Sequence, residues 1–209
     1  MSGKSIPKIE GFLATKSLRD DVLNEMADYL AAKGAVKPSY GAAVIARENV
    51  FPTGIPCEPI GVAIPHSDRA LVEDTTILVA KLPQGVTFTR IDDGDLTVDV
   101  RVVFMLAVNS DQGQLDTIAQ VMDLIQNPEL VQSVACAQSA EEIQRLVEEE
   151  GAEGLYHLGQ LVGCVKRAHD IDANLSAHVM HENLVSKASS VLALLNVIHV
   201  TGIDRNQVE

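Results

Sequence analysis

Aromatic residues, cysteines and long hydrophobic runs are all scarce in this chain. Aromatic residues make up 3% of it, and tryptophan is absent. With a formal net charge of −13, this composition disfavours nucleic acid as a partner, because few rings could stack on bases and an acidic surface repels phosphates. No apolar run approaches membrane-spanning length, and the first ten residues lack the hydrophobic segment of a secretory signal. We therefore expect a cytoplasmic protein without direct membrane insertion.

The three cysteines, Cys57, Cys136 and Cys164, are odd in number and far apart. They do not suggest a disulfide framework, and none belongs to a Cys-x-x-Cys pair. His178 and His181 could share a helix face and, with Cys164, form a zinc site, which leaves a metal-binding module as one alternative. Their spacing matches no standard zinc pattern, so we predict neither a metal nor another cofactor.

The composition is otherwise that of a soluble globular protein, with 46% hydrophobic and 22% charged residues among 209. Hydrophobic periodicity and turn residues predict alternating strands and helices in roughly the first 150 residues. The predicted strands cover 11–15, 60–64, 76–81 and 97–108, and the predicted helices cover 18–33, 39–47, 114–126, 127–137 and 139–150. Ser17 and Asn127 are the expected N-caps, and Gly34 is an expected helix stop. This order predicts the α/β class, with a mixed β-sheet flanked by helices.

The remainder of the chain has a different pattern. Residues 155–165 and 184–198 form two amphipathic helical patterns without intervening strands. We therefore divide the chain into a domain over 1–151 and a helical C-terminal extension over 152–209, whose role the sequence does not indicate. Two such helices need a packing partner, so homo-oligomerisation through them is one expectation.

His66 is presented at the end of an apolar strand. Pro65 lacks an amide donor and should end the pairing there, so the imidazole would face a cleft. A neutral imidazole offers a lone pair for nucleophilic attack or metal binding. Ser67 and Asp68 could hydrogen-bond one ring nitrogen and leave the other free. Alternatively, His66 simply ends a strand, and spacing alone does not decide between these interpretations.

Three motifs follow one another along the sequence, and the last of them ends at His66. The series is Arg47-Glu48-Asn49, then Phe51-Pro52-Thr53-Gly54, then Gly61-Val62-Ala63-Ile64-Pro65-His66. It resembles the enzyme IIA components of the bacterial phosphoenolpyruvate-dependent sugar phosphotransferase system, in the fructose/mannitol superfamily. The form in this chain is most similar to the galactitol-type branch. The resemblance extends from about the first predicted helix to Glu150 and does not cover the extension.

The resemblance implies a phosphotransferase activity. His66 would accept a phosphoryl group from the phosphorylated carrier HPr and pass it to a cysteine of the sugar-specific enzyme IIB, which serves the membrane enzyme IIC. Arg47 would assist by binding phosphoryl oxygens with its guanidinium group. A net acidic chain fits a partner with a basic docking face, as small phosphocarriers have.

Four further residues are candidates for support of the phosphoryl site: Thr53, Ser67, Asp68 and Gln114. Mannitol-type members carry a second active-site histidine just before the helix that follows the long central strand. Gln114 occupies the corresponding position here and can donate a hydrogen bond without adding charge. Asp68 could fix the tautomer of His66 or could be a simple acidic residue at a loop end.

Two functions are consistent with these motifs. The first is a phosphocarrier for uptake of a sugar or sugar alcohol such as galactitol. The second is a regulatory protein of the same fold that controls a partner through its phosphorylation state, with the extension as the interaction element. The 58 residues of the extension keep the second function open.

Overall fold

A five-stranded mixed sheet forms the centre of the computed structural model, which describes residues 7–151 except for the side chains of residues 111–116. The strands are β1 (Lys8–Leu13), β2 (Gly54–Ile55), β3 (Gly61–Ala63), β4 (Thr76–Thr89) and β5 (Thr97–Ala107). Their order across the sheet is β1-β4-β5-β3-β2. β4 pairs antiparallel with β5, whereas β1 and β3 run parallel to their neighbours β4 and β5. Two helices lie between β1 and β2 in the chain, so the parallel neighbours β1 and β4 are joined by a long crossover connection.

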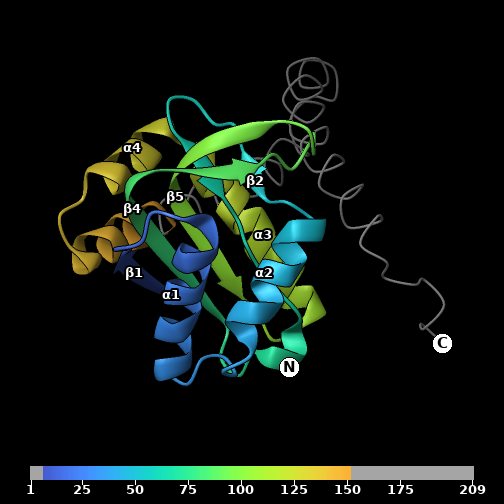
Figure 1. Ribbon diagram of the computed structural model, residues 1–209. Helices are drawn as coiled ribbons and strands as arrows, with labels where there is room; N and C mark the ends of the chain where they lie inside the picture. Colours follow the sequence, from blue (N-terminus) through green and yellow to red (C-terminus); the bar gives the residue numbers. More distant parts are fainter. Residues whose placement is uncertain (1–6, 152–209) are drawn as a thin grey trace, which may run out of the picture. The chain divides into compact units, whose positions relative to one another are not determined.

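The helices pack on both faces of this sheet (Figure 1). They are α1 (Arg19–Ala32), α2 (Tyr40–Val50), the short 3₁₀ helix η1 (Arg69–Leu71), α3 (Asp111–Ile125) and α4 (Pro128–Cys136), and residues 140–151 are also helical. α1 and α2 lie against each other, and α1 also contacts β4, while α3 and α4 contact β5. The predicted α/β class, a mixed sheet flanked by helices, is confirmed.

The two central strands are buried on both faces. In β4, Leu78 and Ala80 belong to the hydrophobic cluster formed with α1 and α2. Ile77 and Val79 alternate with them and are equally buried. Successive side chains of a strand point to opposite faces, so this run of apolar residues faces a helical layer on each side. The core thereby holds the ends of β3 and β5 in fixed positions.

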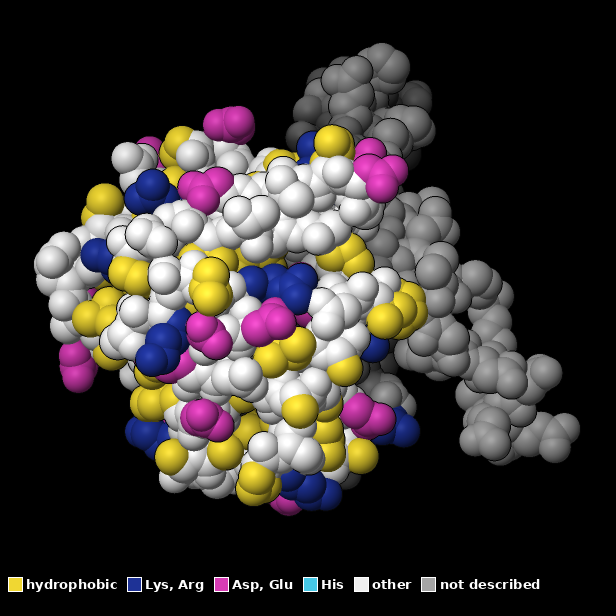
Figure 2. All heavy atoms as spheres, viewed as in Figure 1, with side chains coloured by type: hydrophobic (Ala, Val, Ile, Leu, Met, Phe, Trp, Pro, Cys, Tyr) yellow, Lys and Arg dark blue, Asp and Glu magenta, His cyan; other side chains and the backbone are white. Residues whose placement is uncertain are grey.

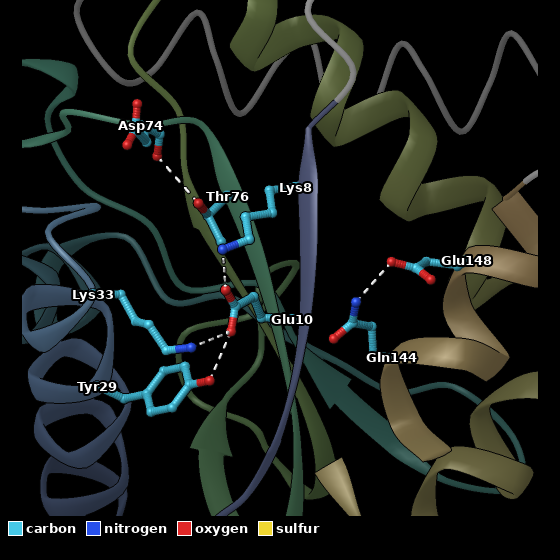
Figure 3. A network of polar contacts seen from close by, with 8 residues as sticks. All are labelled: Lys8, Glu10, Tyr29, Lys33, Asp74, Thr76, Gln144 and Glu148. Carbon is cyan, nitrogen blue, oxygen red and sulfur yellow. Dashed lines mark hydrogen bonds and ion pairs between the residues drawn. The ribbon is translucent and has the colours of Figure 1, made fainter. Parts of the chain in front are cut away.

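The edge strand β1 is covered on both of its faces. On one side Tyr29 donates a hydrogen bond to Glu10 at 2.7 Å, and Lys33 lies 3.4 Å from the same carboxylate (Figure 3). On the other side the helix over residues 140–151 approaches so closely that a Cβ at Gly11 would lie 1.9 Å from the carbonyl oxygen of Ala140. Only glycine fits this contact.

Charged side chains are mixed on the surface. Figure 2 shows acidic, basic and apolar side chains interspersed over one face of the domain, without a large patch of one sign. Among the residues that the structure describes, four large apolar side chains are exposed: Leu13, Leu18, Val50 and Leu96. The net acidity of the chain is therefore not concentrated on that face.

Several predicted boundaries need correction. β1 begins at Lys8, three residues before the predicted strand, and α1 has Leu18 as its N-cap, so the prediction of Ser17 was wrong. β4 continues to Thr89 through a register shift between Lys81 and Val86, well beyond the predicted end. α2 continues to Val50.

Other local predictions are confirmed. The side chain of Asn127 caps α4 by accepting hydrogen bonds from two backbone N–H groups, and Gly34 follows α1 with a φ of 77°. The two predicted helices of the C-terminal extension lie outside the described residues.

Candidate functional site

His66 follows β3 in a segment that stays beside β5. The N–H of Leu106 donates to the carbonyl oxygen of Pro65 at 3.0 Å, and His66 and Leu106 form an isolated bridge. Because Pro65 has no backbone N–H, it cannot donate a hydrogen bond to a neighbouring strand. The histidine therefore lies where regular pairing ends, and its side chain is partly exposed.

The tautomer of His66 is set by its own backbone. Nδ1 lies 2.9 Å from the carbonyl oxygen of Ile64, a contact that requires a proton on Nδ1. The lone pair of the neutral ring is then on Nε2. Burial lowers the pKa of His66 to about 4, the Ile64 carbonyl opposes this shift, and the positive charge of Arg47 adds to it. The ring of His66 is accordingly neutral at physiological pH.

Arg47 lies near His66 on the last turns of α2. Its Nε atom is buried and has no hydrogen-bond partner among the residues that the structure describes. Its guanidinium carbon lies 5.4 Å from the centre of the Phe51 ring, which supports the group from one side. Burial lowers the pKa of Arg47, and nearby Glu48, Tyr40 and Asp68 counteract this. A buried donor without a partner is costly, so this nitrogen is suited to bind an anion.

Glu48 and Thr53 join α2 to the loop that leads into β2. The buried carboxylate of Glu48 accepts hydrogen bonds from the backbone N–H of Thr53 at 2.9 Å and from its hydroxyl at 2.8 Å. The carbonyl oxygen of Thr53 in turn accepts from the N–H of Ile64 at 3.3 Å. Burial raises the pKa of Glu48, and the two bonds from Thr53 counteract it. Thr53 therefore acts on the His66 segment through hydrogen bonds within the protein.

Tyr40 opens α2 and reaches the same segment from the other side. Its side chain is fully buried, and its hydroxyl donates to the carbonyl oxygen of Leu106 at 2.7 Å. Burial raises the pKa of the phenol, and the nearby backbone N–H of Ser67 and the charge of Arg47 oppose that rise. One helix thus supplies Tyr40, Arg47 and Glu48 around a single histidine.

The remaining predicted site residues are distributed unevenly. Ser67 follows His66 and is partly exposed. The carboxylate of Asp68 accepts from the N–H of Ala70 at 2.8 Å and caps η1, so the ring proton of His66 goes to Ile64 instead. Gln114 lies on α3, but its side chain is outside the described residues. The structure brings His66, Arg47 and the Thr53 loop together.

No sequence motif assigns a role to Tyr40, and Glu48 appears only as a neighbour of Arg47. The signal that could have indicated them is their spacing. Tyr40, Val44 and Glu48 occur at intervals of four residues and form the buried face of α2. Two polar side chains on a buried helix face must find partners. Tyr40 finds one in Leu106, which is bridged to His66, and Glu48 finds one in Thr53.

The sequence model of one family matches residues 12–150, which is most of the described part of the chain. The description of that family is phosphoenolpyruvate-dependent sugar phosphotransferase system, EIIA 2. The chain belongs to this EIIA family. It therefore carries a phosphocarrier domain of the phosphotransferase system. Among the described residues of this EIIA chain, no helix is long and apolar enough to cross a membrane.

Two curated relatives match stretches of different length in this chain. The galactitol-specific EIIA component of Escherichia coli K12 is 34% identical over 116 residues, which are 56% of this chain and 77% of the relative. The beta subunit of component C of the glycine/sarcosine/betaine reductase complex of Peptoclostridium acidaminophilum is 50% identical over 80 residues. Those residues are 38% of this EIIA chain and only 16% of the length of that relative.

A solved structure supports the fold of the EIIA domain. The complex of enzyme IIA-mannitol with phosphorylated enzyme IIB-mannitol from Escherichia coli matches with a TM-score of 0.55 at 18% identity. The match covers 71% of this chain and 97% of the solved chain. It agrees with the mixed sheet and flanking helices described above.

Proposed function

We propose that this EIIA chain accepts a phosphoryl group from phosphorylated HPr on Nε2 of His66 and passes it to a cysteine of an enzyme IIB. The observation that carries the proposal is the pairing of a neutral histidine, whose Nδ1 is held by Ile64, with the unpartnered buried Nε of Arg47. The two groups supply a lone pair and a positive charge at one place. Phosphoryl transfer requires mainly positioning and charge neutralisation, which these groups provide.

The first step forms one bond and breaks another. The Nε2 lone pair of His66 attacks phosphorus, while the bond between phosphorus and its donor atom on HPr breaks and leaves its electron pair on that atom. In the second step a thiolate of enzyme IIB attacks the same phosphorus, and the electron pair of the N–P bond returns to Nε2. Nδ1 keeps its proton throughout and donates it in a hydrogen bond to the Ile64 carbonyl oxygen, which stabilises the positive charge of the phosphorylated ring.

Arg47 is the proposed binding residue for the phosphoryl oxygens. Its guanidinium group could contact two oxygens at once. Thr53, Ser67, Asp68 and Gln114 remain proposed support residues. The internal bonds of Thr53 and Asp68 favour roles in shaping the loops around the site.

The names of the relatives support the proposed partners and sugar. The IIA-mannitol structure holds a phosphorylated IIB, and the relative from Escherichia coli K12 is specific for galactitol. We propose an enzyme IIB of the galactitol type as acceptor, with a membrane enzyme IIC beyond it, and a cytoplasmic location. We also propose the division into an EIIA domain over 1–151 and an extension over 152–209, which agrees with the end of the family match at residue 150.

A transfer assay tests this proposal. The protein, phosphorylated with labelled phosphoenolpyruvate, enzyme I and HPr, is freed from the donors and mixed with a galactitol-type IIB. Loss of label from this chain, with equal gain by IIB, is the expected result. A IIB variant with its acceptor cysteine changed to serine is the control. Retention of the label on this chain in the presence of active IIB would exclude the carrier role.

The 50% identity to a reductase subunit favours one second candidate. In this second candidate function, the phosphorylation state of the EIIA domain regulates a partner protein in amino-acid reduction. The test compares binding of phosphorylated and unphosphorylated protein to the purified component C of such a reductase. Binding to one form only would support regulation, and equal or no binding would remove this candidate.

A further inference from the structure

A tyrosine hydroxyl connects α2 to Leu106 of β5, which in turn pairs with the segment that carries His66. Tyr40 donates this hydroxyl to the carbonyl oxygen of Leu106 at 2.7 Å. The N–H of Leu106 in turn donates to the carbonyl oxygen of Pro65 at 3.0 Å. Both polar groups of one β5 residue are thus occupied, one by α2 and one by the residue before His66.

The same hydroxyl also meets the residue after His66. The backbone N–H of Ser67 lies close enough to the Tyr40 oxygen to lower the pKa of the phenol, although burial raises that pKa by more. A hydroxyl can donate one hydrogen bond and accept others, so Tyr40 can hold Leu106 and Ser67 at once. The backbone before His66 is therefore joined to the end of β5 and, through Leu106, to Tyr40, while the backbone after His66 lies close to the same hydroxyl.

We propose that Tyr40 is a positioning residue for phosphoryl transfer, because its hydroxyl holds residues 65–67 in place and so sets the direction of Nε2 of His66. The inference rests on the proposed function. An in-line displacement is sensitive to small errors in the direction of attack, and a misplacement of about 1 Å can cost about a hundredfold in rate. Ile64 fixes the rotation of the ring, and Tyr40 fixes the backbone from which the ring projects.

Packing alone does not account for the hydroxyl. The ring of Tyr40 fills the core together with Val44 and Met26, and a phenylalanine ring would occupy nearly the same volume. The oxygen is buried, yet its hydrogen-bond partner is the backbone carbonyl of Leu106, which is bridged to His66 and does not belong to α1 or α2. A buried hydroxyl is retained without cost only where it is satisfied, and here its partner is at the site.

The test measures phosphoryl acceptance from phosphorylated HPr by the full chain carrying Tyr40→Phe. We expect kcat to fall by about tenfold or more, while KM for phosphorylated HPr stays within about twofold of wild type, because the docking surface is unchanged. Tyr29→Phe is the matched control. It removes a hydroxyl of the same kind, which donates to Glu10 at 2.7 Å beside β1, and it should keep the wild-type kcat. Thermal unfolding confirms that each variant is folded at the assay temperature.

Amide hydrogen exchange of the wild type provides a measurement that does not depend on the folding of a variant. The Ser67 amide should exchange at least about a hundredfold more slowly than an exposed loop amide. Free exchange of Ser67, or an unchanged kcat in folded Tyr40→Phe, would overturn the inference while leaving the carrier function intact. Failure of the wild type itself to accept a phosphoryl group would instead refute the proposed function.

Discussion

Nδ1 of His66 lies 2.9 Å from the carbonyl oxygen of Ile64, two residues earlier in the chain. This contact fixes the tautomer without help from another side chain. It leaves Asp68 free to cap η1, and it directs the lone pair of Nε2 away from the backbone. The chemistry proposed for the site follows from this one short-range relationship together with the position of Arg47.

Substitution of Arg47 should reduce transfer more than binding. Arg47→Lys keeps a positive charge but loses the planar fork that could contact two phosphoryl oxygens. We expect the rate of phosphoryl acceptance to fall by about a hundredfold, measured by rapid quench with labelled phosphorylated HPr. Arg145→Lys, at an exposed pair with Glu149, is the control and should match wild type. A wild-type rate for Arg47→Lys would show that the guanidinium does not bind the phosphoryl group.

The titration of His66 should be displaced to acid. Because burial lowers its pKa to about 4, the ring stays neutral from pH 8 down to about pH 5. An NMR titration, with the His66 signal assigned by His66→Gln, should show its midpoint near pH 4. Phosphoryl acceptance should show no loss attributable to His66 between pH 6 and 8. A midpoint above pH 6 would mean that the ring is not desolvated.

The lowered pKa of His66 also makes the unfolding free energy depend on pH. The unfolded chain binds a proton at His66 near pH 6.5, whereas the folded chain does so only near pH 4. The stability that the neutral His66 ring contributes is therefore fully present above pH 6.5 and is lost progressively as the pH falls toward 4. Between pH 7 and 5 wild type should lose up to about 2 kcal/mol more of its unfolding free energy than His66→Gln. Equal losses in urea titrations of the two proteins would contradict the shift.

Removal of the Thr53 hydroxyl should weaken the connection between α2 and the loop before β2. Thr53→Val leaves the buried carboxylate of Glu48 with one hydrogen bond from Thr53 where it now has two. We expect a loss of about 1–3 kcal/mol in unfolding free energy, measured by chemical denaturation. Thr53→Ser retains the hydroxyl and should lose clearly less. Equal losses for the two variants would show that the hydroxyl contributes no more to stability than the methyl group does.

Gly11 should tolerate no side chain. A methyl group there would meet the backbone oxygen of Ala140 at 1.9 Å, so Gly11→Ala must displace the helix over residues 140–151 from β1. A destabilisation of about 1–3 kcal/mol is expected from thermal or urea unfolding. Gly94→Ala is the control, because no atom lies within 4 Å of the added carbon. Similar stability of the two variants would show that the helix does not pack on β1 as described.

Sequence patterns predict the parts of the fold that depend on local physics. The apolar run from Thr97 and the cap at Asn127 were sufficient to predict β5 and α4. β4 could not be predicted in full, because Pro83 and Gly85 indicate a break, whereas the strand continues after a register shift. Pairing with β5 overrides the local preference there.

The residues of the site likewise divide into those that the sequence predicts and those that it does not. His66 and Arg47 belong to compact motifs, so the sequence alone indicates them. Tyr40 lies 26 positions from His66 in the chain, and its role depends on the packing of α2 against the end of β5. Such a contact between distant segments leaves little trace in residue spacing beyond the buried helix face.

The most direct test of the central claim is the intact mass of the protein after incubation with phosphoenolpyruvate, enzyme I and HPr, compared between wild type and His66→Ala. If His66 is the phosphoryl acceptor, wild type gains the mass of one acid-labile phosphoryl group, and His66→Ala, confirmed as folded, gains none. The absence of any gain by wild type, or a gain that persists in His66→Ala, would contradict the assignment of His66 as the phosphoryl acceptor.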